Sequence, residues 1–169
     1  EMCIRDRATL HGDFNDANIL LHDDKWGILD VGDCVYSWRV NDVAIGAAYV
    51  MVNLCTPENE RSGFSSKGDH VAVQGAQKFV EGFLQRSTLS SDEKRALPHL
   101  IAARLATSFT LGWYSYRESL AAQPDMPKQR RDYLLHHALP AATALDVCLE
   151  ATSLVADWPT TTPTRDPRR

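Results

Sequence analysis

The sequence predicts an α+β protein that is mostly α-helical, with one small β-hairpin near the amino terminus. Two short apolar runs, residues 19–21 and 26–29, flank the polar segment 22–25, which is the pattern of a β-hairpin. From residue 42 onward, apolar residues recur mainly at helical spacing, and turn-forming residues divide this part of the chain. We therefore expect a hairpin followed by a helical body.

The first two helices of that body follow directly from the pattern. Residues 42–54 are apolar almost all round, which predicts a buried helix, and we expect it to pack under the hairpin. Residues 57–68 are rich in serine, glycine and charge and predict a loop. Asp69 can then cap a helix that runs to about residue 86.

The remaining helices are predicted mainly from residues that start or stop a helix. The segment 90–93, SSDE, matches a capping box and predicts a helix start. Pro98 should break this helix, so we expect a new one from about residue 99 to 120. The prolines of 124–127 predict another break. Helical patterns follow around Tyr133 and over residues 141–157.

The two ends of the chain differ from this middle part. Residues 1–7 follow neither period, and residues 2–7 match the translation of a common sequencing adapter, so we interpret 1–7 as a non-native leader. Residues 158–169 end in the polar run TTTPTRDPRR, which predicts a disordered tail. Residues 8–157 then form the single domain that a chain of 169 residues favours.

Composition and charge exclude several kinds of partner. The formal net charge is −4 and the 18 basic residues form no stripe interleaved with aromatics, so we expect no nucleic-acid partner. No segment reaches the roughly 18 uninterrupted apolar residues of a membrane span. No signal sequence opens the chain, so we expect no membrane partner. The scattered cysteines favour a cytoplasmic protein and argue against a thiolate zinc site; they are Cys3, Cys34, Cys55 and Cys148.

Three polar residues around the predicted hairpin indicate chemistry. Asn18 would begin the first strand and Asp30 would follow the second, so both would lie at one end, with Asp13 on the loop that leads in. An amide oxygen and a carboxylate suit Mg²⁺, which takes further ligands from water and substrate phosphates. Asp13 is then free to accept a proton from an attacking hydroxyl. Together with His11, this spacing matches the phosphoryl-transfer template.

Two segments resemble a known family. HGDFNDANIL (residues 11–20) and GILDVGDCVYSWRVNDVAIGAAYVM (residues 27–51) resemble the catalytic and metal-binding segments of the aminoglycoside phosphotransferase family, which is protein-kinase-like and includes choline kinase-like enzymes. The second segment most resembles the hydroxylysine kinase branch. The same holds for RLATSFTLGWYS and RDYLLHHALPA (residues 104–115 and 131–141), so the resemblance covers most of residues 10–149, with its first segment the most specific.

The resemblance implies a kinase-like C-terminal lobe with its site residues on the motif. Asp13 would be the catalytic base, and Asn18 and Asp30 would bind Mg²⁺ and, through it, the nucleotide. His11 would position the catalytic loop. Three residues would support the site: Asp33 by adding charge near the metal, Asp42 by holding the loop through its backbone, and Arg104 from a helix facing the substrate cleft.

The activity implied is transfer of the γ-phosphate of GTP or ATP to a hydroxyl of a small amine-bearing molecule, above all 5-hydroxylysine. An aminoglycoside, choline or a homoserine-like alcohol would use the same loop and stays open as the acceptor. No glycine-rich loop and no strand lysine precede His11, so we expect this lobe alone to be inactive. Two other readings also stay open: a metal-dependent phosphohydrolase and a non-catalytic truncated lobe.

Several of these residues also have purely structural explanations. Turns attract aspartate and asparagine in any protein. Arg104 could pack against the core with its charged end in solvent. We interpret Cys34 as a small buried thiol and Trp38, Trp113 and Trp158 as packing residues.

Overall fold

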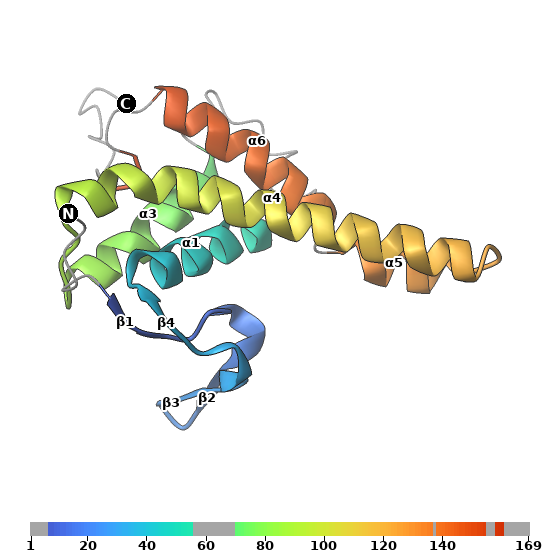
Figure 1. Ribbon diagram of the computed structural model, residues 1–169, viewed down its shortest axis with the longest axis horizontal. Helices are drawn as coiled ribbons and strands as arrows, with labels where there is room; N and C mark the ends of the chain where they lie inside the picture. Colours follow the sequence, from blue (N-terminus) through green and yellow to red (C-terminus); the bar gives the residue numbers. More distant parts are fainter. Residues whose placement is uncertain (1–6, 56–69, 137, 155–157, 161–169) are drawn as a thin grey trace.

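The computed structural model describes residues 7–55, 70–136, 138–154 and 158–160. This part is mostly helical with short strands, as the sequence predicts (Figure 1). The strands are β1 (Arg7–Leu10), β2 (Ile19–His22), β3 (Lys25–Ile28) and β4 (Val35–Trp38). The helices are α1 (Val40–Leu54), α3 (Val71–Leu84), α4 (Ser91–Ala122), α5 (Lys128–Leu135) and α6 (Ala138–Leu154).

Some predictions fall wholly or partly outside the described residues. These are the leader except Arg7, the loop over 57–68, the cap at Asp69, the last residues of the helix predicted over 141–157, and the tail from residue 161. Arg7 begins β1. For α3, the residue that caps the helix is His70, whose Nδ1 accepts a hydrogen bond from the Ala72 N–H at 3.1 Å.

The predicted hairpin is present as β2 and β3. Its antiparallel register pairs Ile19 with Ile28 and His22 with Lys25. β2 is therefore one residue longer than expected, β3 begins one residue earlier, and the turn has only two residues. Those two, Asp23 and Asp24, have φ of 45° and 60°. Two successive residues with positive φ are the mark of a turn that follows the natural twist of a hairpin.

A second pair of strands, which the sequence analysis did not predict, encloses this hairpin. β1 and β4 are antiparallel, with Arg7 opposite Trp38 and Leu10 opposite Val35. β1 leads into the motif loop and β4 leads out toward α1. The segment between them, which contains the hairpin and all three motif residues, is therefore an excursion closed at its base by two paired strands (Figure 1).

The core lies among the helices. α1 packs against α3 and α4, and α4 packs against α6. The sequence predicted that α1 would pack under the hairpin; its main contacts are instead with other helices, because its apolar surface meets their apolar faces. The fully buried residues of this core include Met51, Val73, Val80, Leu97, Ile101 and Leu105.

α4 begins with the predicted capping box. The Ser90 Oγ accepts a hydrogen bond from the Glu93 N–H at 3.2 Å, and the Ser90 N–H donates to Glu93 Oε2 at 2.8 Å. These two bonds satisfy backbone donors that a helix start otherwise leaves unpaired.

The predicted break at Pro98 is wrong, because α4 continues through it to Ala122. Proline removes one backbone hydrogen bond inside a helix. Here the loss is outweighed by packing, since Leu97, Ile101 and Leu105 are fully buried on either side of Pro98 and hold the helix in one piece.

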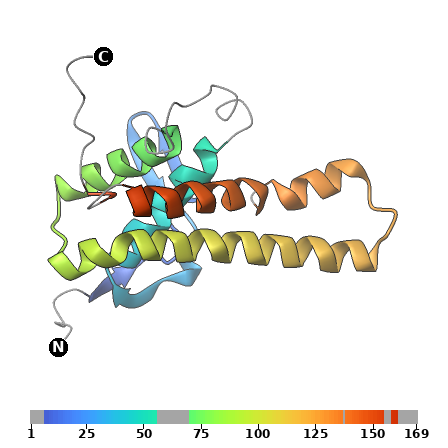
Figure 2. The ribbon, with the colours of Figure 1, turned by 90° about the horizontal axis from the view of Figure 1, so that it is seen from above.

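The distal half of α4 and α5 project beyond the core. Figure 2 shows α4 and α6 side by side, with the far end of α4 returning through a turn into α5. This turn occupies the break predicted at 124–127, and Met126 is buried there. Among the described residues, every helix is too short or too polar to cross a lipid bilayer.

Candidate active site

The motif loop begins with a tight turn at Gly12. Its φ is +83°, in the left-handed region that glycine adopts without strain. A Cβ at this position would lie 2.5 Å from the backbone oxygen of Asp33. The turn therefore requires glycine for two reasons, its backbone conformation and the close approach of the segment after the hairpin.

Asp42 anchors the backbone of this turn from the first turn of α1. One carboxylate oxygen accepts the His11 N–H at 2.7 Å, and the other accepts the Gly12 N–H at 3.0 Å. Hydrogen bonds to an ionised acceptor are stronger than those between neutral groups. A carboxylate on the buried α1 thus fixes the start of the loop to the helical core.

The His11 ring links the loop to the end of the hairpin. Its Nε2 lies 2.7 Å from the Leu29 carbonyl oxygen, and its Nδ1 lies 3.3 Å from the Asp13 backbone N. A carbonyl only accepts and an N–H only donates, so these partners select the neutral ring with the proton on Nε2. His11 therefore connects the backbone of Asp13 to the backbone at the end of the hairpin.

The Asp13 carboxylate receives donors on both oxygens. Its Oδ1 accepts from Arg104 Nη2 at 2.5 Å and from the Tyr49 hydroxyl at 3.4 Å. Its Oδ2 accepts from the side-chain amides of Asn15 at 2.9 Å and Asn18 at 3.5 Å. Asp13 is half-buried, and groups from the loop, α1 and α4 together fix its orientation.

Asn15 and Asn18 shape the rest of the loop. Asn15 caps the 3-10 turn Asp16–Asn18, its Oδ1 accepting the backbone N–H groups of Ala17 and Asn18 at 2.9 and 3.2 Å. The Asn18 amide nitrogen donates to the Asp13 carbonyl at 2.9 Å. Since the nitrogen of Asn18 is engaged, its amide oxygen is the atom left for another ligand.

Asp30 lies beside Asn18 at the base of the hairpin. The Leu29 N–H donates to the Asn18 carbonyl at 2.9 Å, which continues the strand pairing up to the residue before Asp30. Asp30 has a φ of +53°, an uncommon conformation for a residue with a side chain. Within the described part of the chain, the exposed carboxylates of Asp30 and Asp33 have no hydrogen-bond or ion-pair partner.

These positions bear on metal binding. Asn18 and Asp30 are at the same end of the hairpin, as predicted, and offer one amide oxygen and one carboxylate. Among the described residues, no three His, Cys, Asp or Glu side chains form a cluster that could hold a metal ion. A cation at Asn18 and Asp30 would therefore take its other ligands from water and phosphate oxygens, which is how proteins commonly hold Mg²⁺.

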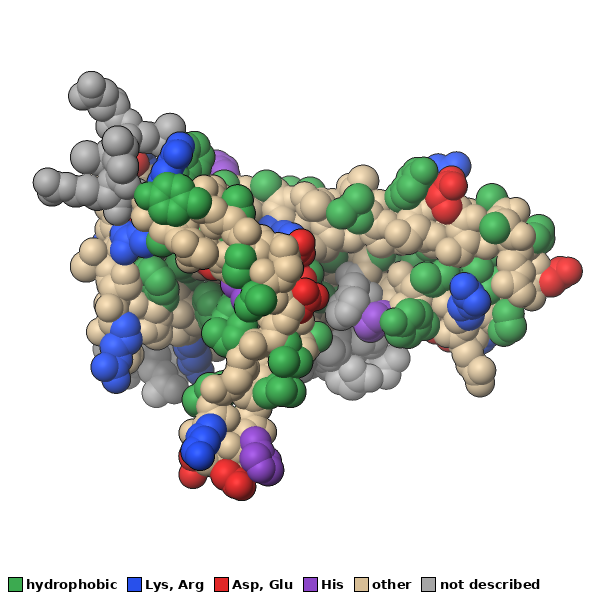
Figure 3. Space-filling view, turned by 60° about the horizontal axis from the view of Figure 1, so that its bottom comes forward, with side chains coloured by type: hydrophobic (Ala, Val, Ile, Leu, Met, Phe, Trp, Pro, Cys, Tyr) green, Lys and Arg blue, Asp and Glu red, His purple; other side chains and the backbone are tan. Residues whose placement is uncertain are grey.

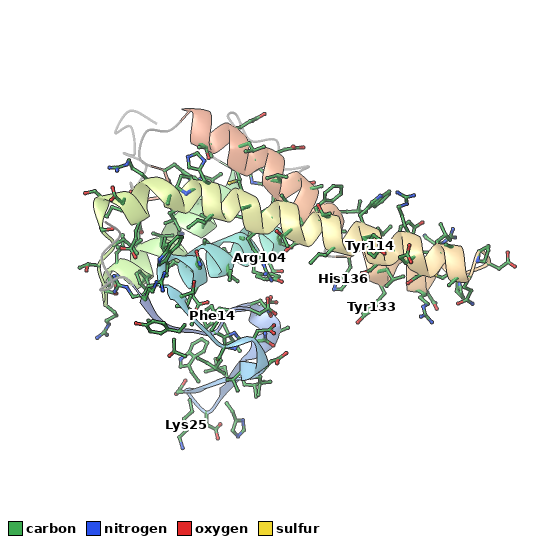
Figure 4. The ribbon with its side chains drawn as sticks, in the orientation of Figure 1. Phe14, Lys25, Arg104, Tyr114, Tyr133 and His136 are labelled. Carbon is green, nitrogen blue, oxygen red and sulfur yellow. The ribbon has the colours of Figure 1, made fainter. Side chains whose placement is uncertain are left out.

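A pocket opens beside Asp13 between α1 and α4. It has a volume of about 210 Å³ and is lined by Tyr49, Val52, Arg104, Thr107, Ser108 and Leu111. Arg104 Nη2 donates to the Tyr49 hydroxyl at 2.8 Å, and its Cζ lies 5.1 Å from the centre of the Tyr49 ring. Figure 4 shows Arg104 below α4, in the space between that helix and the loop that carries Phe14.

Large hydrophobic side chains are exposed around the hairpin. Figure 3 shows them gathered around the projecting hairpin, whose tip carries charged residues. Exposed hydrophobic patches of this kind typically mark an interaction surface. The residues of this hairpin surface are Leu20, Leu21, Trp26, Ile28, Leu29, Val31, Val35 and Tyr36, which are between 44% and 73% exposed.

Sequence analysis missed two residues of the site and misjudged another. Asn15 was identifiable, because asparagine two residues after Asp13 suits a turn cap. Tyr49 follows Asp42 by seven residues, so the two share a face of α1, and this spacing was the available signal. Cys34, which we expected to be buried, is exposed, because it lies in the turn between the hairpin and β4 and not in the core.

Comparisons with known proteins find similarity over the same segment. Residues 5–70 match the profile of the phosphotransferase enzyme family, abbreviated APH. The hydroxylysine kinase of Mus musculus is 30% identical over 115 residues, a match that covers 62% of this chain and 27% of that protein. The chain thus spans about a quarter of this relative. No solved structure matches significantly. Residues 5–70, the segment that carries the His11–Asp13 turn, the hairpin and Asp42, are therefore similar to the phosphotransferase enzyme family.

Proposed function

We propose that this chain is the C-terminal lobe of a small-molecule kinase that moves the γ-phosphate of GTP or ATP to a hydroxyl. The observation that carries the proposal is the Asp13 carboxylate. It sits on a loop anchored by Asp42, receives donors on both oxygens, and stands next to Asn18 at the base of the hairpin. Phosphoryl transfer depends on positioning and charge stabilisation, and this carboxylate is positioned from three elements.

In the proposed mechanism, Asp13 orients the acceptor hydroxyl and takes its proton as the new oxygen–phosphorus bond forms. The bond between the γ-phosphorus and the bridging oxygen breaks, and the nucleoside diphosphate leaves. The side-chain amides of Asn15 and Asn18 hold the carboxylate in place. His11 acts through the backbone by fixing the position of Asp13, so it is a positioning residue. Such proton transfer by a positioned carboxylate contributes roughly 10²- to 10⁴-fold to a reaction rate.

Asn18 and Asp30 are the residues that would hold Mg²⁺. Among the described contacts, the amide oxygen of Asn18 and the carboxylate of Asp30 have no partner, and their place at one end of the hairpin supports this fit. When bound, the ion supplies neutralising charge for the β- and γ-phosphates. Asp33, exposed in the adjoining turn, adds negative charge at the same end.

The acceptor we propose is 5-hydroxylysine, supported by the name of the mouse relative and by the pocket beside Asp13. An aminoglycoside, choline or a homoserine-like alcohol is the alternative acceptor class. A non-catalytic truncated lobe is the alternative to an active enzyme. We place the protein in the cytoplasm on its cysteine usage alone.

The hairpin surface supports a further part of the proposal, that a nucleotide-binding lobe covers this face in the complete protein. Eight large hydrophobic side chains are exposed there, directly beside Asn18 and Asp30. Burial of such side chains stabilises an association, at roughly 25 cal/mol per Å² of apolar area. We accordingly expect this lobe alone to be inactive.

The test uses the full-length product of the gene that carries this chain. Purified protein is incubated with Mg²⁺, γ-labelled GTP or ATP, and a panel of hydroxylated amines that includes 5-hydroxylysine. We expect labelled acceptor with the wild type and a loss of at least about 100-fold in kcat for Asp13→Asn, with nucleotide binding retained. Asp16→Asn, an exposed carboxylate on the same loop, is the matched control. Wild-type rates in Asp13→Asn contradict the assigned role, and no labelled acceptor with any alcohol contradicts the function.

A further inference from the structure

We propose that Arg104 recognises a carboxylate on the acceptor, so that the pocket between α1 and α4 takes a hydroxylated amino acid in preference to an alcohol that carries only amines. This inference rests on the proposed function, because it assigns the specificity of the same site. It depends on the charge of the pocket, on the free donors of Arg104 and on the distance between Arg104 and Asp13.

Among its described lining residues, the pocket offers no free carboxylate to a purely cationic substrate. Among the described residues, its lining includes one guanidinium and three hydroxyls, and no carboxylate. The carboxylate of Asp13 is paired with Arg104 through its Oδ1 at 2.5 Å. An ammonium group entering this pocket would meet the guanidinium without a free counter-charge, whereas a carboxylate would meet an opposite charge.

Arg104 retains a donor for such a ligand. Its Nη2 donates to Asp13 Oδ1 and to the Tyr49 hydroxyl, which uses both hydrogens of that nitrogen. Its Nε is enclosed and has no hydrogen-bond partner among the described residues. Among the described contacts Nη1 makes no hydrogen bond, and it is not enclosed as Nε is, while the side chain as a whole is 25% exposed. Nη1 is therefore the donor available to a ligand in the pocket.

The hydroxyls next to Arg104 extend this recognition. Thr107 Oγ1 donates to the Ala103 carbonyl at 2.8 Å, so its hydrogen is used within α4. Ser108 has no such bond among the described contacts, and its hydroxyl can donate to an acid group held by Nη1. One charged donor and one neutral donor then face the same part of the pocket.

The geometry also limits the size of the acceptor. Nη1 and Nη2 belong to one planar fork, and Nη2 already touches the carboxylate that we assign to the reacting hydroxyl. A ligand that places its hydroxyl at Asp13 and its acid at Nη1 must be short, with only a few bonds between the two groups. This favours a single amino acid over a large sugar substrate.

The experiment compares two ligands that differ only in the acid group. Binding of 5-hydroxylysine and of its carboxamide to this chain is measured by calorimetry, without nucleotide. We expect the acid to bind the wild type at least about tenfold more tightly, since a hydrogen bond to a charged partner is worth that factor or more. In Arg104→Gln the acid should fall to the affinity of the amide. Arg117→Gln, an exposed arginine further along α4, should keep the preference.

The wild-type comparison decides the inference without any variant, so misfolding of Arg104→Gln cannot obscure it. Equal affinities, a preference for the amide, or no binding of either ligand would overturn it. The proposed function fails separately, if the full-length protein phosphorylates no alcohol. If the chain prefers the acid in binding but the full-length protein transfers no phosphoryl group, the assignment of Arg104 stands and the proposed kinase function is wrong.

Discussion

Removal of the Asp42 carboxylate should release the motif loop from the core. In Asp42→Ala, the backbone N–H groups of His11 and Gly12 lose acceptors that now lie at 2.7 and 3.0 Å. A hydrogen bond to a charged group contributes about 1.5–3 kcal/mol, and partial exposure of Asp42 places each bond toward the lower end. We therefore expect the two together to contribute roughly 3–4 kcal/mol to closure of the loop. This corresponds to a change of roughly 140- to 700-fold in its opening equilibrium.

Amide hydrogen exchange, measured residue by residue, tests this magnitude. The exchange of the His11 and Gly12 amides should accelerate by that factor in Asp42→Ala, while amides in the middle of α4 change much less. Asp42→Asn should keep one of the two bonds, because an amide offers one oxygen and its nitrogen faces the other N–H. Asn41→Ala, which removes only a 3.4 Å contact to Ser37, is the control. If exchange at both amides stays within twofold of wild type in Asp42→Ala, the anchoring argument is wrong.

The remaining predictions concern Gly12, Cys148 and Ser90. Gly12→Ala should destabilise the fold by more than about 1–2 kcal/mol, the cost of a left-handed backbone for a residue with a Cβ, and an unchanged urea midpoint would contradict the turn geometry. Burial raises the pKa of the Cys148 thiol to about 12 from its ordinary value of 9.0. It should therefore resist thiol reagents at pH 8 in the native protein, while the exposed Cys34 reacts. Because the unfolded thiol ionises at lower pH than the folded one, stability should fall as pH rises from about 9.0 to about 12. Cys148→Ala should reduce that fall, and identical pH profiles would refute the linkage. Ser90→Ala should cost about 0.5–2 kcal/mol in urea unfolding by removing the capping box, and Ser91→Ala, its exposed neighbour, should cost less.

Local interactions made part of this structure predictable. The hairpin, the α4 capping box and the break before α5 each depend on a few consecutive residues, so apolar spacing and turn chemistry were sufficient to predict them. Pro98 was predicted wrongly for the opposite reason. Its local effect is unfavourable to a helix, and only packing of Leu97, Ile101 and Leu105 against the rest of the protein keeps α4 continuous.

The candidate site was likewise predictable from the sequence only in part. The sequence by itself determined which residues stand together on the motif loop and at the hairpin base, because Asp13, Asn18 and Asp30 are joined by one short excursion of the chain. Only the tertiary structure decided what surrounds Asp13. Arg104 is 91 residues away in sequence and reaches Asp13 because α4 packs against α1, which also brings Tyr49 to the same oxygen. The partners of a half-buried carboxylate depend on how whole helices pack, and helix packing is settled by side-chain fit across the core.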